Sequence, residues 1–375
     1  MRFKIAPHYE QSRPVTTLER EWMSASGWVL VMDPPGGASL FPDQQVVGRP
    51  WIGGDDIERA YVLRGKSGAQ AYLDRCRSFY ERSQYDVVWI GPNELDYKEA
   101  EIRHAAAEFW PEWADLMARR SYKTGVVCSS QGQPDVTNEQ QIEELRPALE
   151  CGDYLVLHEY GWPRLEQSVP WHTLRYRLLA DLCERMGIVL PPILIGELGL
   201  DRNVSGEESA GWRKAPGIST TLYAQDLAWY AEEIGADDRV EAAFLFGCNP
   251  SNRWNSHQVT RSLIIELLAA WSTRHPDDAV PVPEEPTDPE AEDVSWALWD
   301  AMRSRRLSRF AGAALTKKAR GLGFVQESNE QIVTVDADEY VAQIWYDENT
   351  DQRWLVWCVR GHYTPDDIRI ARESE

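Results

Sequence analysis

Short apolar runs alternate with amphipathic segments along the first 274 residues of the chain. Within the amphipathic segments apolar residues return every three or four positions, as in the stripe of Leu174, Leu178, Leu182 and Met186. This alternation predicts repeated strand–helix units and a parallel sheet. The predicted strands are 3–8, 28–33, 45–51, 86–91, 123–129, 153–160, 192–198 and 240–247.

Eight strand–helix units in about 270 residues match the size of a (β/α)8 barrel, whereas a doubly wound open sheet seldom needs eight. No glycine-rich phosphate loop of the GxGxxG or GKS/T type follows any predicted strand, which disfavours nucleotide binding. We therefore predict the α/β class and a (β/α)8 TIM barrel. Functional residues are expected where the strands end, because the loops there form the mouth of such a barrel.

The composition changes at HPDDAVPVPEEPTDPEAED, residues 275–293, which is rich in proline and acidic residues and has no aromatic residue. Such a stretch buries too little apolar area to fold, and its prolines keep it extended. The sequence thus predicts a barrel domain over 1–274, an acidic linker over 275–293 and a small α+β domain over 294–375.

Charge and cysteine usage exclude several classes of partner. The chain has 39 Lys and Arg against 60 Asp and Glu, a net charge of -21, which repels nucleic acid and anionic lipid. No apolar stretch is long enough for a membrane span, and none resembles a secretory signal. The six cysteines form no CxxC pair. A cytoplasmic protein with reduced thiols is therefore expected, with release by lysis left open. No His, Cys, Asp or Glu spacing indicates a metal site, and no cofactor is predicted.

Polar residues with catalytic potential stand at the ends of the predicted strands. Asn93 and Glu94 follow the fourth strand, His158 and Tyr160 lie in the sixth, and Glu197 ends the seventh. A lone glutamate after a strand is often a helix cap, but Glu94 and Glu197 would project into the same mouth from strands three units apart. Two carboxylates that face each other can hydrolyse a glycosidic bond, one as proton donor and the other as nucleophile.

The segments VWIGPNELD, LVLHEYGWP, ILIGELGLD and FLFGCNPSNRW resemble strands four, six, seven and eight of the clan A glycoside hydrolases, which include cellulases, mannanases and β-glycosidases. The resemblance implies that Glu94 is the acid/base, that Glu197 is the nucleophile and that Asn93 binds the sugar 2-hydroxyl. Two departures, Asn-Glu-Leu for the usual Asn-Glu-Pro and Gly-Glu-Leu-Gly for Thr-Glu-Phe/Cys-Gly, spare the reacting groups but leave the particular family unassigned.

The same resemblance implies supporting residues around the two glutamates. His158 would be a subsite residue, Tyr160 would donate a hydrogen bond to the nucleophile, and Arg49 would lie near that nucleophile. Further expected substrate contacts, from loops that follow strands, are Trp162, Trp254 and Asn252, with Trp51 and Trp212 as additional candidates.

The chemistry asks for two different environments. Glu94 must hold a proton, so apolar neighbours such as Trp89, Trp162 or Trp254 are expected around it, whereas Glu197 must stay ionised and needs donors such as Tyr160, Arg49 or Asn93. Glu159 alternates away from its neighbours and is expected to face the helix layer or the rim of the barrel.

These expectations favour a retaining glycoside hydrolase that acts on oligo- or polysaccharides with β-linked, or equivalent equatorial, bonds. A barrel that has lost catalysis and only binds glycans is the alternative. A lyase or aldolase is disfavoured because no strand ends in the lysine that a Schiff base needs. The tail begins with a helical pattern and continues with a predicted hairpin over 340–361; packing or self-contact is expected for it, with glycan binding through Trp345, Trp354 and Trp357 as the other possibility.

Overall fold

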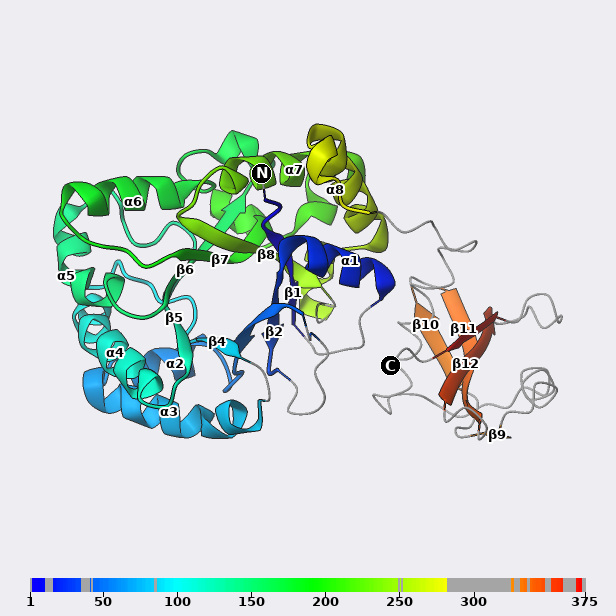
Figure 1. Ribbon diagram of the computed structural model, residues 1–375, viewed down its shortest axis with the longest axis horizontal. Helices are drawn as coiled ribbons and strands as arrows, with labels where there is room; N and C mark the ends of the chain where they lie inside the picture. The colour runs from blue at the N-terminus through cyan, green and yellow to red at the C-terminus, as the bar shows by residue number, and fades with distance from the viewer. Residues whose placement is uncertain are drawn as a thin grey trace. The chain divides into compact units, whose positions relative to one another are not determined.

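The computed structural model is shown in Figure 1. It divides into two compact units, Met1–Val282 and Pro283–Glu375, which are considered separately. The division falls inside the predicted linker. The structure describes residues 2–10, 16–34, 41, 43–83, 86–248, 250 and 252–281 of the first unit, and residues 325–326, 331–335, 338–347, 352–359 and 369–372 of the second.

The first unit is a closed barrel of eight parallel strands in sequential order. The ring closes where the first strand pairs with the eighth, with Ile5 opposite Ala243. This confirms the predicted (β/α)8 barrel, and each predicted strand is present to within a few residues. The strands are β1 (Ile5–Tyr9), β2 (Trp28–Met32), β3 (Gln45–Arg49), β4 (Val87–Ile90), β5 (Lys123–Ser129), β6 (Tyr154–Gly161), β7 (Ile193–Leu200) and β8 (Val240–Cys248).

Helices surround the barrel, and their starts follow capping chemistry. Thr16 and Glu19 form a reciprocal capping box at the first helix, and Asn138, Ser219 and Thr260 accept backbone N–H groups at later ones. The α-helices are α1 (Thr17–Ser26), α2 (Asp55–Val62), α3 (Gly65–Arg82), α4 (Ala100–Ala118), α5 (Glu139–Leu149), α6 (Arg175–Arg185), α7 (Thr220–Gly235) and α8 (Arg261–Arg274). Short 3-10 helices are η1 (Glu166–Ser168), η2 (Arg202–Ser205), η3 (Trp212–Lys214), η4 (Asn252–His257) and η5 (Pro276–Asp278).

Large aromatic side chains fill the layer between sheet and helices. Trp110 and Trp113 of α4 are fully buried and pack edge to face. Gly91, directly after β4, makes room for this packing, because a Cβ there would lie 2.4 Å from the Trp110 ring. The segment that carries Asn93 and Glu94 begins two residues later. The close contact between Gly91 and Trp110 therefore helps to position this segment.

The barrel unit continues beyond the predicted end at residue 274. The Trp271 indole donates to the carbonyl of Asp278 at 3.2 Å, and Ser272 Oγ is bonded to both backbone groups of Val280. Residues 275–281 therefore pack against α8 and belong to the barrel unit. The rest of the predicted linker, 282–293, lies outside the described residues.

In the second unit the described strands form an antiparallel sheet in the order β10-β11-β12-β13, with β9 paired to β11. In the β11–β12 hairpin residue 345 lies opposite residue 354, within the range predicted for a hairpin. The helical pattern predicted after residue 294 lies outside the described residues. The strands are β9 (Val325–Gln326), β10 (Gln331–Val335), β11 (Asp338–Asp347), β12 (Gln352–Val359) and β13 (Arg369–Arg372).

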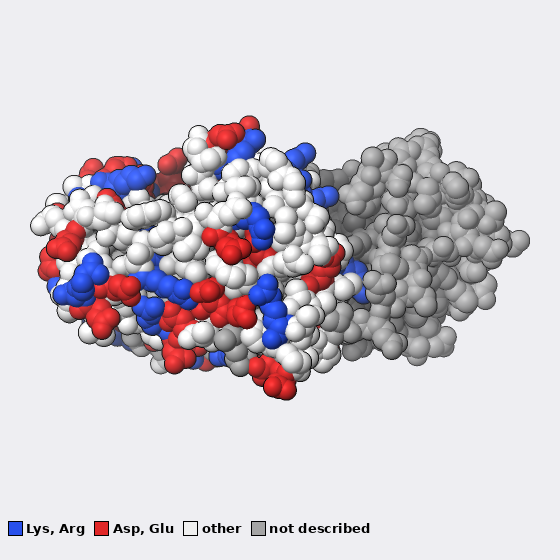
Figure 2. All heavy atoms as spheres, turned by 90° about the horizontal axis from the view of Figure 1, so that it is seen from above, with Lys and Arg blue, Asp and Glu red and all other residues white. Residues whose placement is uncertain are grey.

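Figure 2 shows one face of the barrel unit, on which acidic and basic side chains are interspersed rather than gathered by sign. Among the described residues, no helix is both long enough and apolar enough to cross a membrane.

Candidate active site

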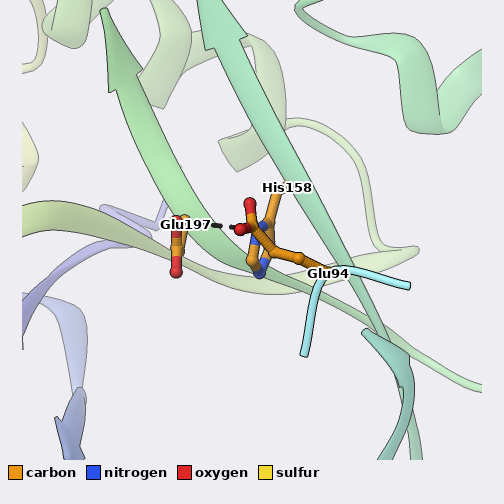
Figure 3. A group of neighbouring side chains, drawn as sticks. All are labelled: Glu94, His158 and Glu197. Carbon is orange, nitrogen blue, oxygen red and sulfur yellow. Dashed lines mark ion pairs between the residues drawn. The ribbon is translucent and has the colours of Figure 1, made fainter. Parts of the chain in front are cut away.

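Three strand ends bring Glu94, His158 and Glu197 together at the mouth of the barrel (Figure 3). His158 Nδ1 lies 3.4 Å from Glu94 Oε1 and 3.6 Å from Glu197 Oε2. One ligand atom of each residue lies within 4.8 Å of the other two. The two carboxylates predicted from the strand ends thus face one small space.

The chain reaches this position through an unusual backbone at Glu94, whose φ is +50°. That left-handed conformation is uncommon for a residue with a side chain and often marks a functional site. The preceding residue is held firmly, since the Asn93 N–H donates to buried Glu58 Oε2 at 2.7 Å. The Glu94 side chain remains 39% exposed at the mouth.

A bulge in β5 adds a residue that the sequence analysis missed. Val127 and Cys128 have φ values of +71° and +35°, and the pairing of β5 with β6 shifts between Val126 and Ser129. The buried Cys128 thiol donates to Asn93 Oδ1 at 3.0 Å, and its sulfur lies 4.0 Å from His158 Nε2. The sequence shows only a cysteine in an apolar run, with no signal that the strand bulges.

Glu197 lies deeper than Glu94, with 13% of its side chain exposed. On the neighbouring strand Tyr160 donates its hydroxyl to Glu197 Oε2 at 2.7 Å, which is the contact implied by the resemblance. The Tyr160 ring packs edge to face on Phe246 of β8, which fixes the direction of the hydroxyl.

Arg49 acts on Glu197 through its charge rather than through a direct contact. It is buried at the end of β3, and its guanidinium lies 3.6 Å from Asp55 and 3.8 Å from Glu58, both in the acidic first turn of α2. No ion pair joins it to Glu197 in the described part of the chain. Two of its nitrogens, Nε and Nη2, have no hydrogen-bond partner there, so its charge acts on the glutamates from a distance.

The predicted tryptophan contacts separate into buried and exposed groups. Trp212, in η3 after β7, is buried and stacked on Tyr223, so little of its ring is open to solvent. Trp254 packs edge to face on Phe246, and Trp162 is half-buried against the core. Asn252 begins η4, and its side chain is outside the described part.

Two exposed tryptophans stand at the mouth end of the barrel. Trp51 follows β3, and Trp171 lies in the long loop between β6 and α6; each exposes about half of its surface. Trp171 was not among the predicted contacts, although Trp162 from the same loop was. Both rings are available for stacking on flat apolar faces.

The charges at the site are strongly coupled. Burial lowers the pKa of His158, but the charge of Glu197 and hydrogen bonds with Cys128 and Glu94 outweigh it and raise that pKa well above its usual value. Burial raises the pKa of Glu94, yet the hydrogen bond and charge of His158, with the charge of Arg49, produce a net lowering. Burial also raises the pKa of Glu197, and here the His158 charge and the Tyr160 bond offset it only in part.

These directions are the reverse of the predicted environments, in which Glu94 holds the proton and Glu197 is ionised. The physical reason is His158, whose cation lies 3.4 Å from Glu94 and 3.6 Å from Glu197. Trp89, expected as an apolar neighbour of Glu94, instead packs on Tyr80 of α3 in the helix layer.

Glu159 faces the helix layer, as predicted. It is buried and accepts hydrogen bonds from the backbone of Leu174 and Tyr176, at the start of α6, and from the Tyr230 hydroxyl. Burial raises its pKa to about 7. Glu159 is therefore a structural carboxyl group behind the site.

Fold and site together define a (β/α)8 barrel with a pair of carboxylates and a histidine at its carboxyl end. No protein-family model matches the chain, and no curated protein matches it. Among solved structures, it is similar to an oligosaccharide-binding protein of GH128 subgroup VII from Trichoderma gamsii, with 12% identity, 72% of this chain and 95% of that chain covered, and a TM-score of 0.41.

Two further structures show a comparable likeness. A GH2 beta-galacturonidase from Eisenbergiella tayi bound to galacturonate has 11% identity, covers 72% of this chain and 51% of its own, and has a TM-score of 0.43. GH26C from a Muricauda species has 12% identity, covers 78% of this chain and 85% of its own, and has a TM-score of 0.41. Likenesses this distant leave function to the residues of the site.

Proposed function

We propose that the chain is a retaining glycoside hydrolase of the clan A type, which cleaves β-linked or equivalent equatorial bonds in oligo- or polysaccharides. The observation that carries the proposal is the convergence of Glu94 and Glu197, whose nearest oxygens lie within 4.8 Å at the mouth. Retaining enzymes hold their two carboxyl groups about 5–5.5 Å apart, whereas inverting enzymes need room for a water molecule between them.

In the proposed reaction Glu197 attacks the anomeric carbon while Glu94 protonates the departing oxygen, which gives a covalent glycosyl-enzyme and a free alcohol. Glu94 then removes a proton from water, the water oxygen bonds to the anomeric carbon, and the bond to Glu197 breaks. Tyr160 and His158 favour the anionic form of Glu197, as this attack requires.

The pKa of Glu94 is lowered in the structure, and it has to rise before Glu94 can act as the acid. A sugar that covers the mouth would bury the exposed 39% of the Glu94 side chain, and burial raises the pKa of a carboxyl group. Binding of substrate and protonation of Glu94 are therefore coupled in this proposal.

Asn93 is prepared for contact with a sugar hydroxyl. Its Oδ1 accepts from Cys128, and its backbone N–H is held by Glu58, so the amide N–H2 group remains to donate to the 2-hydroxyl. Exposed Trp51 and Trp171 would extend the binding surface to a longer glycan. For the second unit we propose glycan binding or self-contact.

The test combines substitution with trapping. Glu94→Gln and Glu197→Gln should each abolish turnover of aryl glycosides while circular dichroism shows an intact fold, and azide should rescue Glu197→Gly with formation of the opposite anomer. The matched control is Glu184→Gln, on the exposed side of α6, which should retain full activity.

A fluorinated sugar should label the peptide that contains Glu197, as found by mass spectrometry. Full activity in either glutamine variant would refute the assignment. Saturable glycan binding without turnover by the native protein would instead favour the lapsed, glycan-binding barrel.

A further inference from the structure

The residues at the mouth also have the geometry of a metal-ligand set. Glu94 Oε1 and Glu197 Oε2 lie 3.4 and 3.6 Å from His158 Nδ1. Ligand atoms about 2.0–2.1 Å from a tetrahedral zinc ion are roughly 3.3–3.4 Å from one another. The two distances from His158 match this spacing, and the two carboxylate oxygens, within 4.8 Å of each other, would reach it by a rotation of the partly exposed Glu94 side chain. Because these ligands come from three different strand ends, no short sequence spacing signals the set, and the sequence analysis predicted no metal site.

A second observation points to a ligand between the carboxylates. The His158 side chain is only 2% exposed, and its Nδ1, which faces both carboxylates, has no hydrogen-bond partner of normal geometry among the described residues. Buried polar nitrogens are nearly always hydrogen-bonded. Zinc bound by the two glutamates would replace the proton through which His158 Nδ1 pairs with them, release that proton to solvent, and give this nitrogen a metal partner.

The ligand side chains also have neighbours that hold their orientation. Metal-binding histidines usually donate their other ring N–H to a neighbour, and His158 Nε2 lies 4.0 Å from Cys128 Sγ. Ligating carboxylates are usually hydrogen-bonded as well, and Glu197 Oε2 accepts from Tyr160 at 2.7 Å. The partial exposure of Glu94 gives an ion a route from solvent.

The donor set selects the class of metal. One imidazole nitrogen and two carboxylate oxygens supply three protein ligands, which is the number that catalytic zinc sites use, and both ligand types bind zinc. Magnesium and calcium prefer six or more oxygen ligands and disfavour a nitrogen. The charge of Arg49 opposes any cation, but the two carboxylates outnumber it once His158 has given up its proton.

We propose that Glu94, His158 and Glu197 form a binding site for Zn²⁺, and that zinc bound there inhibits sugar hydrolysis. The ion would occupy the carboxylate oxygens that otherwise attack the anomeric carbon and protonate the leaving oxygen. Only the inhibition rests on the proposed function, since zinc binding is measurable without any substrate.

The binding test uses the full chain after treatment with a chelator. Zinc chloride is titrated by calorimetry, and one ion should bind per chain. His158→Gln should weaken binding at least about tenfold, since loss of even an outer partner of a metal site costs that much. Glu94→Gln should weaken it as well, and its partly exposed position makes this the variant to use if His158→Gln does not fold.

The matched control is His104→Gln. His104 Nε2 lies 3.8 Å from Glu144 on the outside of the barrel, so this histidine also faces a carboxylate but lacks a second one. Its substitution should leave zinc binding unchanged. Cobalt chloride provides a spectroscopic check, because a three-ligand site should give visible absorption that disappears in His158→Gln.

The outcomes separate this inference from the proposed function. One zinc ion bound with the expected loss in the mouth variants supports the site, even if no glycoside is hydrolysed. Equal zinc affinity in the native protein, His158→Gln and Glu94→Gln overturns it, and so does the lack of binding in a protein that hydrolyses glycosides. Activity that persists with saturating zinc overturns the inhibition.

Discussion

Replacement of Tyr160 by phenylalanine isolates one hydrogen bond at the heart of the proposed mechanism. The hydroxyl donates to Glu197 Oε2 at 2.7 Å, and both groups lie in a largely buried position. The phenylalanine ring should keep its edge-to-face contact with Phe246, so the change removes the donor and little else. The expected consequence is a loss of rate without a loss of fold.

The magnitude follows from the character of the bond. A hydrogen bond to a charged group contributes about 1.5–3 kcal/mol, and each 1.36 kcal/mol corresponds to a tenfold change in rate. Tyr160→Phe should therefore lower kcat by roughly 10- to 150-fold. The loss should fall mainly on hydrolysis of the glycosyl-enzyme, because negative charge returns to Glu197 in that step.

The assay is steady-state and burst kinetics on an aryl glycoside with a good leaving group. A slowed second step should give a burst of the phenol and a lowered KM. The Tyr160 bond lowers the pKa of Glu197, so without it that pKa rises further, and the acidic limb of the kcat/KM profile should move to higher pH.

The matched control is Tyr72→Phe, which removes the hydroxyl of a fully buried tyrosine on α3 in the helix layer. It should leave the rate and the pH profile unchanged. A Tyr160→Phe enzyme with a rate within about threefold of the native one and an unmoved acidic limb would refute the role of Tyr160.

Three further predictions concern stability. Burial raises the pKa of Glu159 from 4.5 to about 7, so the folded form holds this proton more tightly than the unfolded form. As pH falls from about 7 to 4.5, the free energy of unfolding of the native protein should therefore rise by up to about 3 kcal/mol relative to that of Glu159→Gln. Denaturant unfolding at several pH values tests this, and a pH-independent difference would contradict it. Gly91→Ala should destabilise the barrel by about 1–3 kcal/mol, since its Cβ would lie 2.4 Å from the Trp110 ring, and an unchanged melting temperature would show that the ring moves freely. A chain that ends at residue 282 should have the melting temperature of the intact barrel. One that ends at residue 274 loses three hydrogen bonds to α8 and should have a lower melting temperature. Equal melting temperatures of the two chains would contradict the packing of 275–281.

The sequence predicted the barrel and the convergence of Glu94 and Glu197 for a geometric reason. Parallel strands of a closed barrel all end at the same rim, so residues that end the fourth and seventh strands share a mouth although about a hundred positions separate them. The alternation within β6 likewise predicted that His158 and Tyr160 face one way and Glu159 the other.

The environments of the individual site residues could not be predicted from the sequence, because they depend on distances between elements that no sequence periodicity encodes. The bulge that turns Cys128 toward Asn93 comes from two left-handed residues with ordinary side chains, a conformation without a sequence signal. The ion pair of Arg49 with Glu58 depends on how α2 is positioned relative to β3. The pKa directions of the two glutamates depend on which of them His158 contacts most closely.

His158 explains how two glutamates share so small a space. Carboxylates with oxygens within 4.8 Å repel each other, and burial adds to the cost of ionising both. A buried imidazolium that lies 3.4 Å from one and 3.6 Å from the other offsets this repulsion at its source. A single strand-end glutamate would need no buried cation beside it. His158 is therefore the residue that joins the two acids into one site. A sugar that binds there has to accommodate the charge of His158, whereas a metal ion has to displace its proton.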